Sequence, residues 1–208
     1  MFFYTKDSTH HKFYHYLCTA NKQKYIIVDR KDILWFPMRV TYNRETKVKE
    51  NLDTLGIETF MPIKQVFTIH GGHKKLETIP AIHNLLFVHS SREKLTNLKM
   101  TEEEFSPLRY MMTRPLEKNI RSQIITIPDK LMNNFIRIAS HTDNSVMYLD
   151  YDKVANKIGR KVVVSDGPFA GIEGSVIRVD NNKRVVVKLE GVTAVAIAFV
   201  PPVFLKFI

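Results

Sequence analysis

Residues 159–177 read GRKVVVSDGPFAGIEGSVI, and this stretch decides the fold of the C-terminal part of the chain. Val and Ile alternate with other residues on both sides of the tight turn Asp166-Gly167-Pro168, a pattern typical of short paired strands. Gly171 and Gly174 permit positive φ angles or close backbone approaches that a side chain would prevent. Further Val-rich strands are expected over residues 184–189 and 193–200. We therefore expect a small SH3-like β-barrel, five-stranded if residues 203–207 close it.

The preceding hundred or so residues have a different character, because strands alternate with amphipathic helices there. Asn43 is a plausible cap for a helix that Gly56 ends, and Ser90 with Glu93 forms a possible capping box for a second helix. Pro128 opens a third helix, with Leu131, Phe135 and Ile138 on one face. The pattern predicts an α+β sandwich with a mainly antiparallel sheet. Its strands are expected over residues 33–40, 57–62, 64–70, 73–79, 85–88, 109–113 and 123–127.

Two positions carry special expectations within this part. Pro37 interrupts the first strand and requires an edge position or a bulge, since proline cannot donate to a ladder. Gly71-Gly72 between two apolar runs predicts a hairpin. The resulting division of the chain is an N-terminal extension (1–31), an α+β domain (32–140), a polar linker (141–157) and the barrel (158–208).

The composition bounds the function without identifying it. The 31 Lys and Arg against 21 Asp and Glu give a formal charge of +10, which favours a polyanionic or acidic partner or simply keeps the chain soluble. The single Cys18 cannot form an intrachain disulfide, and no apolar run reaches membrane-spanning length. We expect a cytoplasmic protein, a monomer with no membrane partner.

Two motifs in order then resemble a known family. The 159–177 stretch resembles the KOW motif of NusG proteins and of several ribosomal proteins. The segments WFPMRVTYNRE (35–45) and GIETFMP (56–62) look like the start of an NGN domain, the polymerase-binding half of NusG. IPDKLMNNF (127–135) and FVPP (199–202) are similar to UpxY-type antiterminators, which are encoded with surface-polysaccharide operons. General NusG proteins carry a Pro-Gly-Tyr triplet where this chain has His83-Asn84-Leu85, which favours a specialised paralogue.

The resemblance implies a transcription elongation or antitermination factor that binds RNA polymerase and suppresses pausing and termination, in a capsular polysaccharide operon. In the family, an apolar patch of the NGN domain binds the clamp of the largest polymerase subunit. By position, the candidates for this patch are Trp35, Phe36, Phe60, Met61, Pro62 and Phe87. The alternative for each of them is a place in the hydrophobic core. We expect at least half of them to be core residues, Trp35 and Phe87 before the others.

Two further surfaces follow from the resemblance. Arg39, Tyr42, Asn43 and Arg44 lie at the strand-to-helix corner that approaches non-template DNA in specialised relatives; helix capping and solvated charge are the alternative. In the barrel, Phe169 is expected on a projecting loop that engages Rho or a ribosomal protein, the alternative being that its ring folds into the core. This partner site comprises Asp166, Gly167, Pro168, Phe169 and Gly171.

Enzymatic and metal chemistry find no support in the sequence. His70 and His73 straddle a turn and His10, His11 and His15 lie in the extension, but none has an established zinc spacing. No phosphate loop or nucleophile motif is present, so we expect no catalytic residues, no metal and no cofactor. The main rival reading is a KOW-containing RNA-binding or ribosome-associated protein without polymerase contact. A more distant one is an enzyme with an appended SH3-like domain.

Overall fold

A four-stranded antiparallel sheet forms the centre of the N-terminal part. The structure is a computed structural model that describes residues 33–115, 121–142 and 145–208, so the extension 1–31 with Cys18 lies outside the described residues. The strand order is β2 (Glu58–Phe60), β5 (Leu85–Ser91), β1 (Ile33–Val40) and β6 (Leu108–Tyr110). All neighbouring strands run antiparallel, and the expected mixed fold with mainly antiparallel sheets is confirmed.

Helices cover both faces of this sheet because the side chains of β1 alternate between them. Phe36, Met38 and Val40 pack with Val48 of α1 (Glu45–Thr54) and Leu95 of α2 (Arg92–Thr101). The opposite face carries Trp35 and Phe87 and packs against α3 (Asp129–Ala139). The 3₁₀ turns η1 (Thr41–Asn43) and η2 (Glu103–Phe105) end β1 and precede β6.

Pro37 occupies a central strand without a bulge, and the neighbouring hydrogen bonds show why this is possible. Its nitrogen points toward β6, where the Met111 amide donates to the Pro37 carbonyl at 3.3 Å but no bond returns. The Met111 carbonyl instead accepts from the Ile125 amide at 2.9 Å. The amide hydrogen that Pro37 lacks would lie just beyond the end of the β1–β6 ladder. The Ile125 amide supplies the donor for the Met111 carbonyl in its place.

Two helix caps differ from the expected ones. The hydroxyl of Ser91, not Ser90, accepts from the Lys94 amide at 3.2 Å and caps α2, because β5 runs on to Ser91 and buries Ser90. Asn43 has φ of 51°, a left-handed conformation, so the residue that precedes α1 is Arg44. An N-cap residue has β-region or intermediate angles, which Asn43 does not have here.

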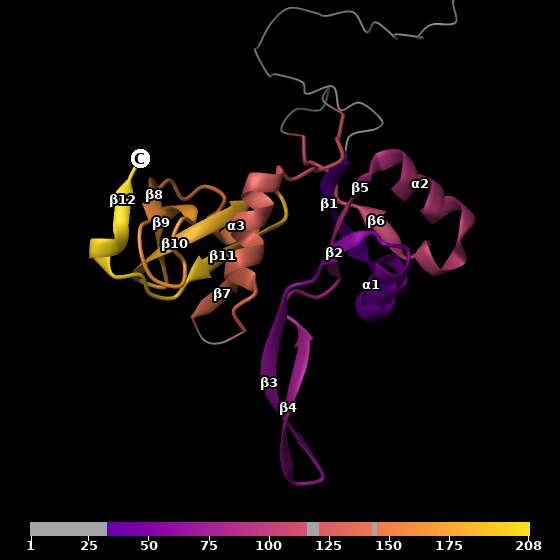
Figure 1. Cartoon of the computed structure of the whole chain (residues 1–208), viewed down its shortest axis with the longest axis horizontal. Helices are drawn as coiled ribbons and strands as arrows, with labels where there is room; N and C mark the ends of the chain where they lie inside the picture. Colours follow the sequence, from indigo (N-terminus) through magenta and orange to yellow (C-terminus); the bar gives the residue numbers. More distant parts are fainter. Residues whose placement is uncertain (1–32, 116–120, 143–144) are drawn as a thin grey trace, which may run out of the picture.

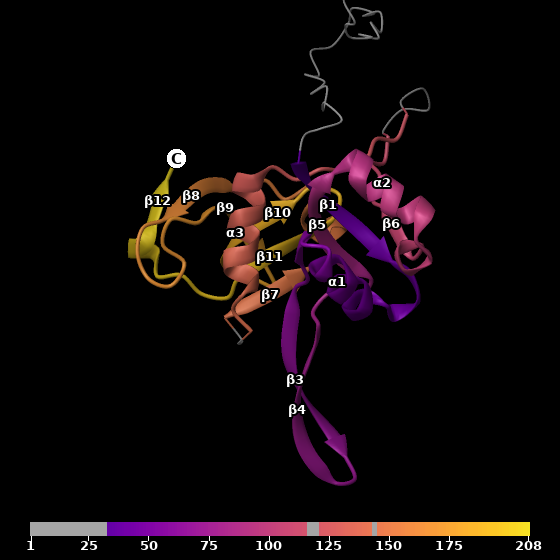
Figure 2. The same cartoon turned by 45° about the vertical axis from the view of Figure 1, so that its right-hand side comes forward.

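A long ribbon of two strands projects from the body of the molecule (Figures 1 and 2). It consists of β3 (Ile63–His70) and β4 (His73–Pro80), which pair along their whole length from Ile63↔Pro80 to His70↔His73. Gly71 and Gly72 have φ of 57° and 84°, the positive values that a two-residue hairpin turn requires. The ribbon is the hairpin that the glycine pair predicts.

The C-terminal part is a six-stranded antiparallel sheet. Its order is β12 (Leu205–Phe207), β8 (Arg160–Val164), β9 (Glu173–Val179), β10 (Asn182–Leu189), β11 (Thr193–Ile197) and β7 (Val146–Leu149). Helix α4 (Tyr151–Val154) follows β7, and the turn η3 (Pro202–Phe204) precedes β12. Strand β7 lies in the segment expected as linker, yet pairs with β11. The identity of this sheet as a KOW barrel stays a prediction.

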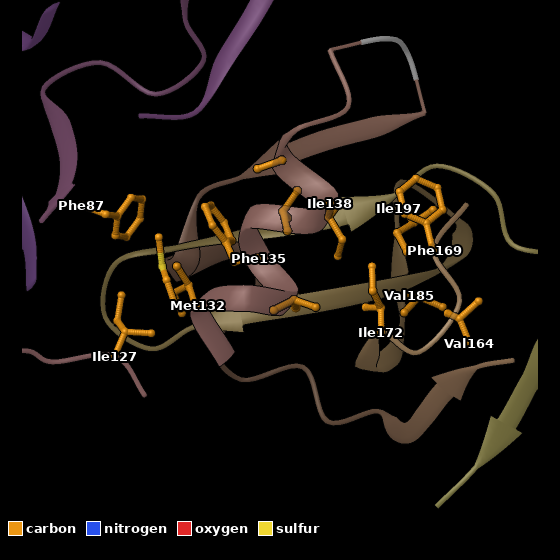
Figure 3. Close-up of a cluster of buried hydrophobic side chains, with 14 of the residues drawn as sticks. Phe87, Ile127, Met132, Phe135, Ile138, Val164, Phe169, Ile172, Val185 and Ile197 are labelled. Carbon is orange, nitrogen blue, oxygen red and sulfur yellow. The ribbon is translucent and has the colours of Figure 1, made fainter. Parts of the chain in front are cut away.

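Helix α3 lies between the two parts and contributes to one continuous core (Figure 3). The ring of Phe135 lies 5.4 Å from that of Phe87 and 6.2 Å from that of Phe60, measured between centroids. Ile138, on the same helix, belongs to the cluster that contains Val185 and Ile197 of the C-terminal sheet. The N-terminal and C-terminal parts therefore share this helix as a common packing element.

Tyr148 of β7 ties the C-terminal sheet to the end of α3, because its hydroxyl donates to the Ala139 carbonyl at 3.1 Å. Burial raises the pKa of Tyr148 to about 12. The folded protein therefore holds this proton more tightly than the unfolded chain, in which a tyrosine titrates near 10. The resulting stabilisation is present below about pH 10 and is lost as the pH rises toward 12.

We expect the free energy of unfolding to fall more steeply between pH 10 and 12 in the wild type than in Tyr148→Phe, which has no proton to lose. Urea unfolding followed by circular dichroism across this range measures both slopes. Parallel curves for the two proteins would contradict the assignment.

Candidate functional site

The corner between β1 and α1 presents an aromatic ring and two guanidinium groups to solvent. Tyr42 is 82% exposed and has φ of 65°, and Asn43 beside it also has a positive φ. Arg39 and Arg44 are exposed, and the Arg44 guanidinium lies 5.7 Å from the centroid of the Tyr42 ring. Two consecutive non-glycine residues in the left-handed region cost free energy, so neighbouring structure must hold them.

Three backbone contacts hold this corner in place. The Val40 amide donates to the Asn84 carbonyl at 3.1 Å, and the Thr41 amide donates to the Pro107 carbonyl at 3.2 Å. The Asn84 amide donates to the buried carboxylate of Glu45 at 2.5 Å. Asn84 itself has φ of 60°, which asparagine tolerates better than most residues. Asn84 therefore links the end of β1 to the start of α1, and the Tyr42 ring stays exposed to solvent.

Arg109 extends the cationic surface next to Arg39, and sequence reasoning missed it. The two arginines are directly opposed on β1 and β6, so their side chains leave the same face of the sheet. Like charges at opposed positions repel unless an anion lies between them. The Arg109 guanidinium donates to the carbonyls of Ser106 and Leu108. Only the pairing register reveals this neighbour, because 70 residues separate the two positions in the chain.

The six apolar candidates do not form one patch. Trp35, Phe60 and Phe87 lie on the face of the sheet that packs against α3, with Trp35 and Phe87 buried. Phe36 and Met61 pack in the opposite core with α1 and α2. Pro62 is buried, and its carbonyl accepts from the Ala81 amide at 2.8 Å where the ribbon leaves the body. Of these three candidates on the α3 side, Phe60 is the one that is partly exposed, at the rim of that face.

His89 crosses this rim and links three elements. Its ring stacks on Trp35 with centroids 4.7 Å apart and planes 7° from parallel. Nδ1 lies 2.7 Å from the Glu58 carboxylate on β2, and Nε2 lies 3.5 Å from the Asp129 carboxylate at the start of α3. The arrangement positions α3 over the sheet beside Phe60. No local sequence signal marks His89, since both carboxylates come from other elements.

The loop over residues 166–171 turns its aromatic residue inward. Phe169 is 6% exposed, and its ring lies 4.7 Å from that of His141. Arg137 of α3 donates to the Ala170 carbonyl at 2.6 Å, which draws the loop onto the helix. The expectation that the Phe169 ring projects from the loop is therefore wrong, and the alternative of a core position is the one that the structure shows. Asp166, Gly167 and Pro168 remain at the surface, with the Asp166 carboxylate accepting from the Gly167 amide at 2.7 Å.

Among the residues that the structure describes, no group of three or more His, Cys, Asp or Glu side chains is placed to hold a metal ion. Within the same residues, no helix is long and apolar enough to cross a membrane. The expected histidines His10, His11 and His15 lie outside the described residues.

The sheet with helices on both faces, the projecting ribbon and the β-rich C-terminal part define a two-part α+β protein with mainly antiparallel sheets. Within it, residues 34–136 match the model of the family described as transcription termination factor nusG, and this match supports a NusG-like factor. The match spans β1 through most of α3. No curated protein matches the chain.

The family match suggests a transcription elongation or termination factor. NusG family proteins are non-enzymatic transcription elongation or termination factors, and they bind RNA polymerase. The strand-to-helix corner and the α3-side face both lie within the matched residues. The C-terminal sheet lies beyond them.

Proposed function

We propose that this chain is a specialised NusG paralogue that binds RNA polymerase and suppresses pausing and termination, in an operon for surface polysaccharide. It catalyses nothing itself and needs no cofactor. The observation that carries the proposal is the NusG family domain whose β1–α1 corner holds Tyr42 outward in a strained conformation. Strain of this kind persists where the surrounding structure enforces it, and it is common at functional sites.

The corner supports a contact with non-template DNA. An exposed tyrosine ring stacks on unpaired bases of any sequence, and arginines beside it hold phosphates. Arg39, Arg44 and the added Arg109 supply three guanidinium groups around Tyr42 and its strand. In our proposal Tyr42 stacks on a base of the displaced strand, with Asn43 available for a base edge.

The rim around Phe60 supports the contact with the polymerase clamp. Phe60 is half-buried and packs at 6.4 Å on Phe87 and at 6.2 Å on Phe135, so its exposed edge has a rigid base. Preformed, partly exposed aromatic residues carry much of the energy of protein interfaces. In this proposal Trp35 and Phe87 support Phe60 from the α3-side core, and Phe36, Met61 and Pro62 hold the sheet and the chain beside it.

We place a second partner, Rho or a ribosomal protein, on the C-terminal sheet. The exposed turn Asp166-Gly167-Pro168 with Gly171 remains available for it, whereas Phe169 is buried.

The experiment is co-purification of bacterial RNA polymerase with the tagged wild-type chain and with Phe60→Ala. We expect the variant to retain at least about tenfold less polymerase, because truncation of an aromatic hot-spot residue costs about 2 kcal/mol or more. Met100→Ala is the matched control. This apolar side chain is 81% exposed and belongs to α2, which packs on the face of the sheet opposite α3. Circular dichroism checks that each variant is folded.

Failure of the wild type to retain polymerase would refute the proposed mechanism. The preferred function would then be an RNA-binding or ribosome-associated protein, which tight RNA binding without polymerase would establish. Equal retention by Phe60→Ala and wild type would leave the factor intact but remove the rim as its contact.

A further inference from the structure

The ribbon of β3 and β4 carries exposed apolar side chains on one face near its turn, whereas its other face is mixed, with lysines beside the partly buried Val66 and Ile79. Opposed residues share a face in an antiparallel pair. The register Phe67↔Leu76 and Ile69↔Lys74 therefore places Phe67, Ile69 and Leu76 together. Lys64, Thr68 and Lys75 leave the other face. Within the described residues, the two strands pair only with each other.

The apolar face is unusually exposed for a side of a β-sheet. Phe67 is 75% exposed, Ile69 is 71% exposed and Leu76 is 50% exposed. Exposed apolar residues grouped on one projecting element indicate a contact surface, whereas isolated ones do not. Both edges of the ribbon are also open, and such edges invite aggregation unless charges protect them.

The charges on the ribbon are predominantly positive. Lys64, Lys74 and Lys75 are exposed along it, against the single carboxylate of Glu77. The Lys75 ammonium lies 3.7 Å from the Glu77 carboxylate, and the side chains of Lys64 and Lys74 are exposed to solvent. The ribbon therefore has exposed apolar residues on one face and lysines on both faces. Such a surface complements a ligand whose flat apolar groups are flanked by negative charges.

We propose that the ribbon is a DNA-binding arm that enters the major groove of a duplex with its Phe67 face toward the bases. The major groove is about 12 Å wide and admits a two-stranded ribbon. Strands of eight residues extend about 27 Å at roughly 3.4 Å per residue, which is long enough to cross it. Phe67, Ile69 and Leu76 then contact thymine methyl groups, and the three lysines reach phosphates on both sides.

The same chemistry argues against a protein partner for this face. Interface cores between proteins are depleted of lysine, whereas Lys74 stands directly beside Ile69 on the apolar face. The inference does not depend on polymerase binding, because the ribbon residues lie outside both the Phe60 rim and the Tyr42 corner. The two proposals therefore fail or hold separately.

Fluorescence anisotropy of the full chain with a short labelled duplex, and separately with one of its single strands, tests the arm with no polymerase present. The apolar variant is Phe67→Ala/Ile69→Ala, and the charge variant is Lys64→Ala/Lys74→Ala/Lys75→Ala. Matched controls remove equally exposed groups elsewhere. They are Phe199→Ala/Val203→Ala for the apolar variant and Lys94→Ala/Lys161→Ala/Lys183→Ala for the charge variant.

We expect the apolar variant to bind at least about tenfold more weakly with an unchanged salt dependence. The charge variant should reduce the slope of log K against log salt by about 2–3, since each lost phosphate contact removes about 0.9. The apolar control should bind within about twofold of the wild type, and the lysine control should keep the wild-type slope.

Three outcomes would overturn the proposal. The first is wild-type affinity in the apolar variant, which would remove Phe67 and Ile69 from the DNA. The second is an equal loss of slope in both lysine variants, which would mean diffuse binding over the basic surface. The third is tighter binding to the single strand than to the duplex. Circular dichroism of each variant establishes that a loss of binding is not a loss of fold.

Discussion

Phe135→Ala should lower the free energy of unfolding by about 3–5 kcal/mol, the cost of removing a fully buried aromatic ring. The ring is 0% exposed and contacts Phe87 and Phe60 of the N-terminal sheet. It projects from the helix that also packs on the C-terminal sheet, so the cavity opens where the two parts meet. Little collapse is expected, because rigid strands lie on both sides of the helix.

Urea unfolding at neutral pH measures this effect, with Phe67→Ala as the matched control. The control removes the same side chain at a position that is 75% exposed, where substitutions usually change stability by less than about 0.5 kcal/mol. A loss below about 1 kcal/mol in Phe135→Ala would show that α3 does not hold the two parts together.

Gly159→Ala should also destabilise the fold strongly, by about 3 kcal/mol or more. A Cβ atom at residue 159 would lie 2.3 Å from the Val176 carbonyl oxygen and 2.5 Å from Cγ2 of Ile177. Both contacts lie on β9, which pairs with β8 from Arg160 onward, so the strand must shift to admit one methyl group. Overpacking of this kind costs about 1–3 kcal/mol, and more when backbone is the obstacle.

The neighbouring substitution Ile158→Ala is the control for this prediction. Ile158 is 99% exposed, and its truncation removes more atoms than Gly159→Ala adds. Thermal unfolding should show a clear fall in Tm for Gly159→Ala and almost none for Ile158→Ala. Similar Tm values for Gly159→Ala and the wild type would mean that β8 and β9 separate at this point more easily than the structure indicates.

Local patterns in the sequence predicted the elements that depend on neighbouring residues. The strand Ile33–Val40 has the expected bounds, the helix α1 ends before Gly56 as expected, and the hairpin strands differ from the expected ranges by one residue at the base, because periodicity and turn chemistry act within a few residues. The NusG resemblance had the same local basis, and the family match agrees with it.

Features that depend on distant partners were not predictable in the same way. Strand β7 became part of the C-terminal sheet only through pairing with β11, more than forty residues away. Trp35 and Phe36 are adjacent in the chain, yet they lie in different cores. Phe169 lies inward because its loop packs on α3. Arg137 of that helix donates to the Ala170 carbonyl, and His141, just after the helix, contacts the Phe169 ring. Register and side-chain direction are properties of the assembled sheets, and a single sequence does not display them.

The shared helix α3 limits how this chain can exchange parts with relatives. Recombination commonly joins protein domains at polar linkers, and the segment after Ser140 has that composition. A cut there would separate Ile138 of α3 from the C-terminal sheet that covers it. If the exchanged part began at residue 158, strand β11 would also lose its partner β7. A transplanted C-terminal half must therefore bring a surface that fits this helix. The two halves are expected to change together in evolution, although the chain reads as two separable modules.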